Sequence, residues 1–398
     1  MDRPLRFGIF MAPFQPAGQN PTLALERDLE LLVRLDQLGF DEAWIGEHHS
    51  AGYEIIGSPE LFIATAAERT HHIRLGTGVV SLPYHHPFMV AERMVLLDHL
   101  TRGRVMLGVG PGALPSDASM LGLDPLRQRP MMEESLEAIL ALLHSDEPVD
   151  RQTDWFALRQ ARLQLRPYTR PRFEVAVAAQ VSPAGPRAAG RFGLSLLSIG
   201  ATTAGGFDVL GSHWTTMEER AAEFGTNVDR RQWRLVGPMH LADTEAQARR
   251  DVEFGLVRWI DYFQRIAALP LAPEGVEPEK AAEMLFEMGF AVVGTPETAI
   301  AQIERLAEQS GGFGTYLIMA TEWADREATL RSYELFAREV MPHFQGSALR
   351  LEKARDAAAD RRPEFVGHLG GAVMQAISDH HAERQERTSD REQRTSPA

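Results

Sequence analysis

Two pairs of histidines follow apolar stretches of the chain and are the residues best suited to do chemistry. His48-His49 follows Glu47 where the apolar run 42–46 stops, and His85-His86 comes just after another apolar run. An imidazole can give or take a proton near neutral pH, and a nearby carboxylate can orient it. In parallel α/β barrels the catalytic groups lie at the carboxyl ends of the strands. The pattern therefore predicts a proton-transfer site at that end of a barrel.

The same side chains have an alternative use as metal ligands. The candidate set is Glu47, His48, His49 and His86. Barrel hydrolases that bind metal through such ligands usually carry a His-x-His pair on the first strand. This chain has Met11 and Pro13 at those positions. We therefore expect no metal site here.

The composition excludes several classes of protein. The chain has 398 residues and a formal net charge of −14, and its basic residues do not cluster, so we expect no binding of nucleic acid. It has no cysteine, which rules out disulfides, thiolate metal ligands and cysteine nucleophiles. The first residues contain no long apolar signal segment, and no apolar run approaches the ~20 residues that span a bilayer. We expect a cytoplasmic protein that does not enter the membrane.

Apolar segments alternate with helical patterns along most of the chain. The helical patterns place leucine, valine or alanine three or four positions apart, as in residues 21–38, which end at Gly39. Eight strands that alternate with helices favour a right-handed parallel barrel. The predicted fold class is α/β, a (β/α)8 TIM barrel with insertions. Its expected strands are residues 6–11, 42–46, 73–80, 104–110, 173–179, 194–199, 235–242 and 315–320.

Three segments depart from the alternation. Residues 146–171 carry aromatic side chains between charged ones and predict a hairpin at the rim of the barrel. Residues of about 263–290 contain three closely spaced prolines, which indicates an insertion or lid. We expect the barrel domain to occupy residues 1–345. Residues 346–398 are a charged, polar extension that we expect to be partly disordered.

Short motifs at and between the expected strands are similar to those of a known family. They are Arg6-Phe7-Gly8-Ile9-Phe10, Glu47-His48-His49, Leu75-Gly76-Thr77-Gly78, Leu82-Pro83-Tyr84-His85-His86-Pro87, Leu97-Asp98-His99-Leu100-Thr101-Arg102-Gly103-Arg104 and Val293-Gly294-Thr295-Pro296-Glu297. In this order they resemble the bacterial luciferase-like flavin-dependent monooxygenases, over about residues 5–344. Within the family the chain most resembles the limonene 1,2-monooxygenase branch, particularly over residues 7–115.

The resemblance implies a fold, a cofactor and partners. The barrel would take reduced flavin, FAD or FMN, from a separate flavin reductase that uses NADH. It would then react the flavin with O2 and use the C4a-hydroperoxide to insert one oxygen atom into a small apolar substrate. Our first expectation is epoxidation of limonene or a related monoterpene by a homodimer. The glycine-rich turn 108–112 lacks the spacing of a dinucleotide fingerprint, which agrees with a nicotinamide bound elsewhere.

The family's catalytic residues match positions in this sequence. His48 corresponds to the essential histidine beside the flavin, which would move a proton to or from the oxygenated flavin. Glu47 and His49 would orient His48, and the resemblance makes His86 a second histidine near the flavin. The alternative for each is a purely structural side chain.

The resemblance also assigns flavin contacts. Gly78-Val79 stands where the family often has a non-prolyl cis peptide, although close packing also explains a glycine there. Gly110 and Pro111 occupy the turn in which luciferases have a reactive cysteine and an arginine, so that chemistry does not carry over. Ser182 matches a contact to the flavin phosphate, with helix capping as its alternative role. Arg187 could supply the missing positive charge.

Apolar residues on or beside the strands could line a substrate pocket or fill the barrel core. They are Phe10, Phe14, Trp44, Met106, Met239 and Met319. Two other functions stay open at this point. One is a deazaflavin-dependent oxidoreductase, which shares the barrel and transfers hydride without oxygen. The other is a flavin-binding barrel without catalytic turnover.

Overall fold

A closed ring of eight parallel strands forms the centre of the first unit of the chain, residues 1–345, in the computed structural model, which describes residues 4–12, 14–267 and 275–394. Neighbours in the ring follow the order β1-β2-β3-β5-β8-β9-β10-β12, and β12 pairs with β1 to close it. The predicted TIM barrel is confirmed. Its strands are β1 (Arg6–Met11), β2 (Glu42–Ile45), β3 (Arg74–Thr77), β5 (Val105–Gly110), β8 (Glu174–Ala179), β9 (Ser195–Ser198), β10 (Trp233–Leu241) and β12 (Thr315–Met319).

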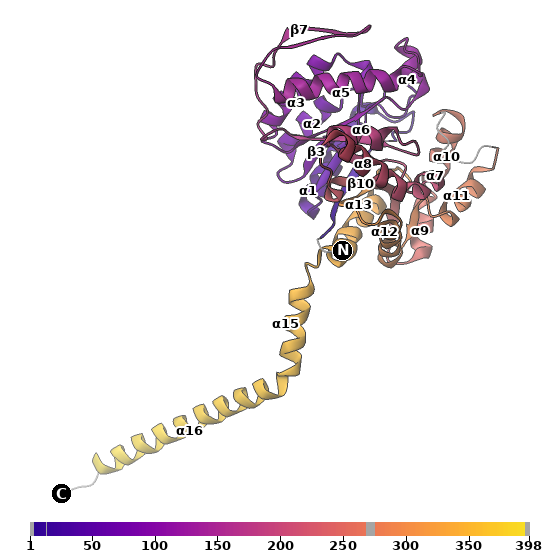
Figure 1. Ribbon diagram of the computed structural model, residues 1–398. Helices are drawn as coiled ribbons and strands as arrows, with labels where there is room; N and C mark the ends of the chain where they lie inside the picture. The colour runs from indigo at the N-terminus through magenta and orange to yellow at the C-terminus, as the bar shows by residue number, and fades with distance from the viewer. Residues whose placement is uncertain (1–3, 13, 268–274, 395–398) are drawn as a thin grey trace. The chain divides into compact units, whose positions relative to one another are not determined.

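The strands are nearly continuous runs of buried residues because helices cover their outer faces. The helices α1, α2, α3 and α5 pack one after another around the barrel (Figure 1). The eight helices that follow the barrel strands are α1 (Pro21–Leu38), α2 (Pro59–Arg69), α3 (Pro87–Leu100), α5 (Gln128–His144), α6 (Ala184–Phe192), α8 (Leu210–Phe224), α12 (Pro296–Ser310) and α13 (Arg326–Leu335). Local signals set their ends: Asn20 accepts the N–H of Thr22 to begin α1, and Gly39 ends it with a positive φ.

Short strands and helices lie in the segments that follow the carboxyl ends of the barrel strands. They are β4 (Val80–Ser81), β11 (Val292–Gly294), α4 (Pro115–Met120), α7 (Ala204–Asp208), α9 (Glu245–Val252), α10 (Leu256–Arg265) and α11 (Pro278–Glu287). Elsewhere lie two 3-10 turns, η1 (Leu82–Tyr84) and η2 (Arg230–Gln232), the π-helical turn η3 (Phe336–Val340) and α14 (Met341–Gln345). The predicted hairpin is confirmed as β6 (Val149–Gln152) and β7 (Ala157–Ala161), which pair antiparallel.

One helix differs from what its sequence pattern predicts. The pattern of residues 244–262, with Thr244 as a cap, predicts a single helix, whereas the structure has α9 and α10 with a break at Gly255. A Cβ at Gly255 would lie 1.8 Å from the carbonyl oxygen of Glu322. The two backbone segments therefore approach so closely that only glycine fits at this position. Within the expected insertion of about residues 263–290, the structure has the end of α10 and the whole of α11. Residues 268–274 lie outside the described residues.

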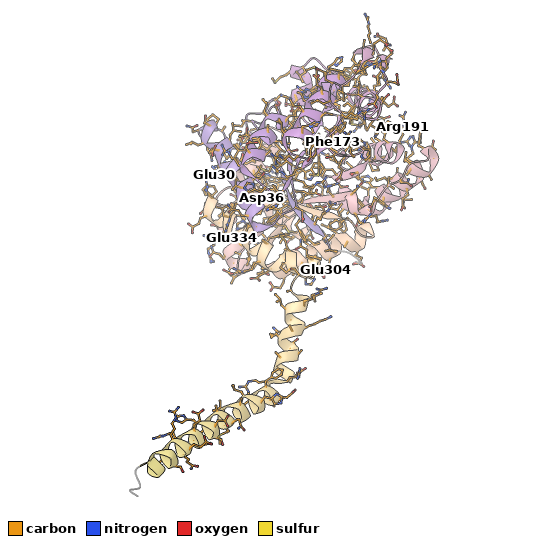
Figure 2. All side chains as sticks on the ribbon, turned by 90° about the vertical axis from the view of Figure 1, so that its left-hand side faces the viewer. Glu30, Asp36, Phe173, Arg191, Glu304 and Glu334 are labelled. Atoms are coloured by element: carbon orange, nitrogen blue, oxygen red, sulfur yellow. The ribbon has the colours of Figure 1, made fainter. Side chains whose placement is uncertain are left out.

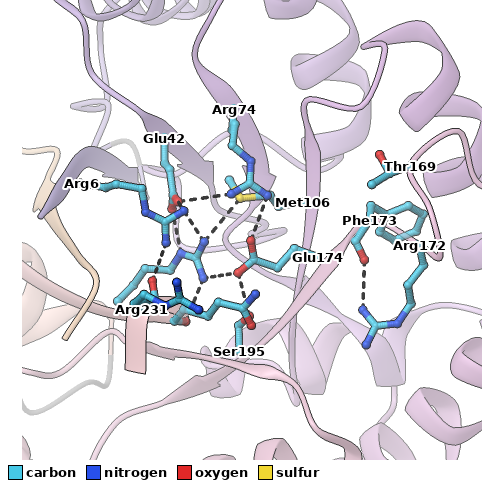
Figure 3. Close-up of polar contacts among 12 residues, drawn as sticks. Arg6, Glu42, Arg74, Met106, Thr169, Arg172, Phe173, Glu174, Ser195 and Arg231 are labelled. Carbon is cyan, nitrogen blue, oxygen red and sulfur yellow. Dashed lines mark hydrogen bonds and ion pairs between the residues drawn. The ribbon is translucent and has the colours of Figure 1, made fainter. Parts of the chain in front are cut away.

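A buried ion-pair network closes the amino end of the barrel, opposite the site described below. Arg234 on β10 contacts two carboxylates: its Nε lies 2.7 Å from Glu42 Oε2 and its Nη1 lies 2.5 Å from Glu174 Oε1. Figure 3 shows the side chains of Glu42, Arg74 and Glu174 pointing toward one another from different strands. Burial alone would raise the pKa of Glu42, but the charge and hydrogen bonds of Arg234 hold it below its ordinary value. The ionised form of each buried carboxylate in the network therefore depends on its arginine partners.

The tightest strand contact predicts the effect of a single methyl group. A Cβ at Gly8 would lie 2.2 Å from the carbonyl oxygen of Glu42 on the neighbouring strand. We expect Gly8→Ala to lower the free energy of unfolding by about 1–3 kcal/mol, because the backbone of β2 cannot move without disturbing the ring. Urea denaturation would measure the change. As a control, Gly367→Ala adds the same methyl group in open space on a helix and should leave the barrel transition unchanged.

The second unit, residues 346–398, contains two helices, α15 (Leu349–Asp360) and α16 (Arg362–Arg394). Sequence analysis expects this extension to be partly disordered, whereas the described residues are mostly helical. Alanine, glutamate and arginine favour helices, and pairs such as Gln375 and Asp379 bond across one turn. Residues 351–389 are exposed, and Figure 2 shows the side chains of α16 projecting outward along its length. Among the described residues, no helix is long and apolar enough to cross a bilayer.

Candidate active site

A cavity of about 530 Å3 opens at the carboxyl ends of the barrel strands. Side chains from the ends of β1, β2 and β12 meet there with loops after β3, β8 and β9. Most of the lining is apolar. Glu47, His48, Glu54 and Ser81, from the segments after β2 and β3, form its polar side, and the loops after β8 and β9 add Gln180 and Thr203. The full described lining is Phe10, Ala12, Phe14, Glu47, His48, Glu54, Gly78, Val79, Ser81, Ala113, Gln180, Val181, Ile199, Gly200, Thr203, Ala204, Gly205, Trp259, Phe263, Leu285, Met288, Phe290, Met319 and Ala320.

Glu47 is a buried carboxylate that pairs with His49 and His85 rather than with His48. Its Oε1 lies 2.9 Å from His49 Nε2 and 2.5 Å from His85 Nε2, and its Oε2 accepts the backbone N–H of Ser81 at 2.7 Å. Burial would raise the pKa of Glu47, but the hydrogen bonds from His49 and His85 outweigh it and lower the pKa. Sequence analysis expects Glu47 and His49 to orient His48. In the structure Glu47 instead joins the loops after β2 and β3.

His48 lies between two other carboxylates. Its Nε2 is 2.8 Å from Glu54 Oε2, and its Nδ1 is 3.3 Å from Asp117 Oδ2. Burial opposes the charged form, but the charges of Glu54 and Asp117 outweigh burial and raise the pKa of His48 to about 10. The sequence suggests an imidazole that titrates near neutral pH. Between these two carboxylates it is an imidazolium throughout the physiological range.

Each carboxylate beside His48 is held by its own local structure. Asp117, on α4, also accepts the hydroxyl of Ser50 and the backbone N–H of His49. Glu54 lies in the loop between β2 and α2, where its Oε1 accepts the hydroxyl of Tyr262 at 3.4 Å. These contacts fix the position of the His48 ring from three separate elements.

The apolar wall comes largely from α10, α11 and the segment after them. Trp259 and Phe263 on α10, Leu285 on α11 and Phe290 line the cavity, and they pack together, with ring centroids of Trp259 and Phe290 5.9 Å apart. Of the six apolar residues singled out from the sequence, Phe10, Phe14 and Met319 line the cavity. Trp44 and Met106 pack with Phe10 inside the barrel, and Met239 belongs to the main core. The pocket therefore uses strand residues on one side and helix residues that the strand pattern could not reveal.

The residues expected to hold flavin fall into two groups. Gly78 and Val79 line the cavity, and the peptide bond between them is cis. Gly110 lies behind them, since a Cβ there would be 2.7 Å from Val79 Cγ2, and the carbonyl of Pro111 accepts the side-chain N–H of Gln128. Gly110 and Pro111 thus support the wall without being among its described residues.

Ser182 and His86 lie away from the described lining. Ser182 is exposed, its neighbours Gln180 and Val181 face the cavity instead, and Pro183 rather than Ser182 precedes the first turn of α6. His86 is exposed at the start of α3 with its ring 6.0 Å from that of Phe156, and Arg187 is also exposed. Among the described residues, no group of three or more histidine, aspartate or glutamate side chains is arranged to hold a metal ion.

Comparison with known proteins identifies the barrel. Residues 5–312 match the family model described as luciferase-like monooxygenase. The chain belongs to this family. This luciferase-like monooxygenase is 50% identical to limonene 1,2-monooxygenase of Rhodococcus erythropolis, over 85% of this chain and 87% of the relative. It is 49% identical to 4-hydroxyprotoasukamycin monooxygenase of Streptomyces nodosus subsp. asukaensis, over 86% of this chain and 93% of the relative.

A solved structure agrees with this family assignment. The oxygenating constituent of 3,6-diketocamphane monooxygenase of Pseudomonas putida, a type II Baeyer-Villiger monooxygenase in complex with FMN, is 27% identical. It superposes with a TM-score of 0.72 over 85% of this chain and 98% of that one. The predicted family and the predicted enzyme class, a flavin monooxygenase, are confirmed.

Sequence analysis missed the two carboxylates that contact His48 and the tyrosine behind them. Asp117 lies within a polar stretch that was not expected to contain a helix, and Tyr262 is 214 positions from His48. Glu54 offered a weak signal, because it is a carboxylate in the loop that follows the histidine pair. A search for ionisable residues in every loop after a strand would have included Glu54 and Asp117 as candidates.

Proposed function

We propose that this luciferase-like monooxygenase uses reduced flavin and O2 to insert one oxygen atom into a small cyclic monoterpene such as limonene, which it epoxidises. The observation that carries the proposal is a cavity that joins an apolar wall to the doubly paired His48, in a chain that is 50% identical to a limonene monooxygenase. We further propose that residues 1–345 suffice for the reaction.

The size and lining of the cavity support the proposal that it holds a flavin together with an apolar substrate. Its volume of about 530 Å3 lies within the ~300–1,000 Å3 of ordinary ligand sites. Gly78, Gly200 and Gly205 present only backbone atoms to the cavity. We propose that Gly78 and Val79 contact the flavin, supported by Gly110 and Pro111, and that the loop of Ser182 lies toward its phosphate. When bound, reduced flavin would supply the two electrons needed for one atom of O2 to enter the substrate and the other to be reduced to water.

The chain's own residues would manage protons and water. His48 would hold a proton at the polar side of the cavity, where an oxygen atom needs it to leave as water. Glu47 would keep the loops after β2 and β3 in register through His49 and His85. His86 would act from outside the described lining. The aromatic side chains of α10 would exclude bulk water from the reacting atoms.

The apolar wall favours a hydrocarbon substrate. Trp259, Phe263 and Phe290 present rings and few polar atoms to the cavity. A substrate with several hydroxyl groups would lose hydrogen bonds to water without replacing them, whereas a monoterpene loses none. The type II Baeyer-Villiger relative is named for a ketone of the camphane class, which is also a compact ring system.

The reaction implies partners that supply electrons. We propose that a separate flavin reductase reduces FMN or FAD with NADH, and that the enzyme works in the cytoplasm as a homodimer. Gel filtration would give the number of subunits. A reductase from any source should support activity if reduced flavin diffuses between the two proteins.

The deciding experiment is an anaerobic titration with reduced FMN, reduced FAD and reduced deazaflavin, followed by oxygen and a panel of monoterpenes. We expect binding of reduced FMN or FAD and formation of limonene 1,2-epoxide with consumption of O2. Chromatography with mass spectrometry would identify the product, and 18O2 would label it. Substrate turnover with reduced deazaflavin and without O2 consumption would contradict the proposal.

A further inference from the structure

Each ring nitrogen of His48 lies close to a carboxylate. Its Nδ1 is 3.3 Å from Asp117 Oδ2 in a hydrogen bond, and its Nε2 is 2.8 Å from Glu54 Oε2 in an ion pair. These two carboxylates are therefore the nearest groups that can take a proton from His48. The geometry of the two carboxylates decides between them.

Asp117 is a closed partner. Its Oδ1 accepts the N–H of His49 and the hydroxyl of Ser50, and its Oδ2 faces His48. It is 1% exposed and is not among the described residues that line the cavity. Asp117 thus serves to hold the Nδ1 side of the His48 ring.

Glu54 is an open partner. It lines the cavity, and its Oε2, apart from the ion pair with His48, receives no well-oriented hydrogen bond from the described residues. Its Oε1 meets only the long contact from Tyr262 among the hydrogen bonds described. The backbone on either side of Glu54 is fixed, because the N–H of Gln15 bonds the carbonyl of Tyr53 and Gln15 Oε1 accepts the N–H of Ile55. The backbone therefore holds the Glu54 side chain at a position that both contacts His48 and lines the cavity.

We propose that Glu54 passes the proton between His48 and the cavity, an inference that rests on the proposed function for the identity of the reacting oxygen. The proton leaves His48 Nε2 and binds Glu54 Oε2, which gives a neutral imidazole and a carboxylic acid. The acid then gives its proton to an oxygen atom in the cavity that already carries one hydrogen, and this oxygen leaves as water. His48 regains a proton from bulk water, so the cycle balances. Throughout the internal transfer the charge of His48, Glu54 and Asp117 together stays at −1.

The contacts on all sides of His48 define what a pH titration would report. Glu54 faces it from the loop after β2 and Asp117 from α4, while Glu47 and His49 adjoin it in the chain. Tyr262 on α10 faces Glu54, and its pKa is raised by burial and by the charge of Glu54, so it stays neutral. The titration of His48 thus depends mainly on the two carboxylates.

The test compares Glu54→Gln, Glu54→Asp and a matched control. Glutamine keeps the size and reaches His48 but cannot carry the proton, whereas aspartate keeps the acid and shortens it by one methylene. Glu134→Gln is the control, because Glu134 is a half-buried carboxylate on α5 that accepts the indole N–H of Trp155 away from the cavity. Circular dichroism and reduced-FMN titration would establish folding and binding for each variant.

The first readout needs neither flavin nor substrate. Histidine labelled with 13C would be titrated by NMR in the full chain, and the signal lost in His48→Gln would identify His48. We expect Glu54→Gln to lower its midpoint by ~1–3 pH units, and Glu54→Asp to restore part of the shift. A midpoint in Glu54→Gln equal to that of the wild-type protein would overturn the proposal, because Glu54 would then not pair with His48 in solution.

The second readout is the fate of oxygen. With reduced-FMN binding unchanged, Glu54→Gln should form product ~10²-fold more slowly and release more hydrogen peroxide, and the pH dependence of product formation should change. A slower reaction with the wild-type pH dependence, or wild-type rates, would overturn the proposal, since a merely structural side chain would act in that way. If the wild-type enzyme oxidises no monoterpene, the proposed function fails, and the NMR titration together with the pH dependence of flavin reoxidation still decides the role of Glu54.

Discussion

His48→Ala is expected to lower product formation by about 10²–10⁴-fold while hydrogen peroxide release rises, because His48 holds the proton that is used at the polar side of the cavity. The variant leaves Glu54 and Asp117 facing each other without the positive charge between them. Product and peroxide would be measured together per NADH consumed, at a saturating concentration of reduced flavin. The ratio separates loss of proton transfer from loss of flavin binding.

Two histidine variants make the comparison specific. His99→Ala removes an exposed imidazole on α3 that contacts the carbonyl of Arg166 and does not line the cavity. This variant should behave as the wild-type enzyme. His86→Ala tests the role that the family resemblance predicts for a residue outside the described lining. Equal losses in His48→Ala and His86→Ala would contradict an active site centred on His48 alone. Wild-type coupling in His48→Ala would remove His48 from the mechanism.

Arg234→Met should destabilise the barrel by about 3–5 kcal/mol, because it leaves Glu42 and Glu174 buried without their central cation. Arg6 and Arg74 still reach these carboxylates, but both are only partly buried and cannot replace the bonds from Arg234. Urea denaturation at pH 7 would measure the loss. In Glu42→Gln/Glu174→Gln/Arg234→Met the charges are absent together, and most of the stability should return.

The pH dependence gives this prediction a sign. Arg234 holds the folded-state pKa values of Glu42 and Glu174 below the ordinary value of about 4.5, despite burial. The ion pairs therefore stabilise the wild-type fold above that pH and lose this contribution as the pH falls through the lower folded values. The difference between wild type and Arg234→Met should shrink on acidification. Arg326→Met is the control, since it removes only a half-exposed pair with Glu30 worth ~0–1 kcal/mol, and an equal effect of both variants would contradict a structural role for the network.

Local sequence patterns were sufficient to predict the fold and part of the site. Apolar runs such as residues 6–11 and 315–320 become neighbouring parallel strands, because an alternation of strands and helices leaves few ways to bury every apolar face. The position of His48 directly after a strand placed it at the carboxyl end of the barrel, where the cavity lies. These features depend on residues close together in the chain, so the sequence alone was sufficient to predict them.

The break at Gly255 shows where such patterns are insufficient. The run that predicts one helix over residues 244–262 is interrupted by contact with Glu322, which is 67 positions away. In the extension, by contrast, exposed residues of high helix propensity form α15 and α16, and the partial disorder expected there stays a prediction.

The sequence by itself determined the barrel, the family and the positions of Glu47 and His48. Only the tertiary structure decided which groups contact them: Glu47 pairs with His85 from the segment after β3, and His48 pairs with Asp117, 69 positions away. It also decided that His48 is charged at neutral pH, because a pKa depends on burial and on the distance to each neighbouring charge. Those distances arise only when loops from separate strands meet at one end of the barrel.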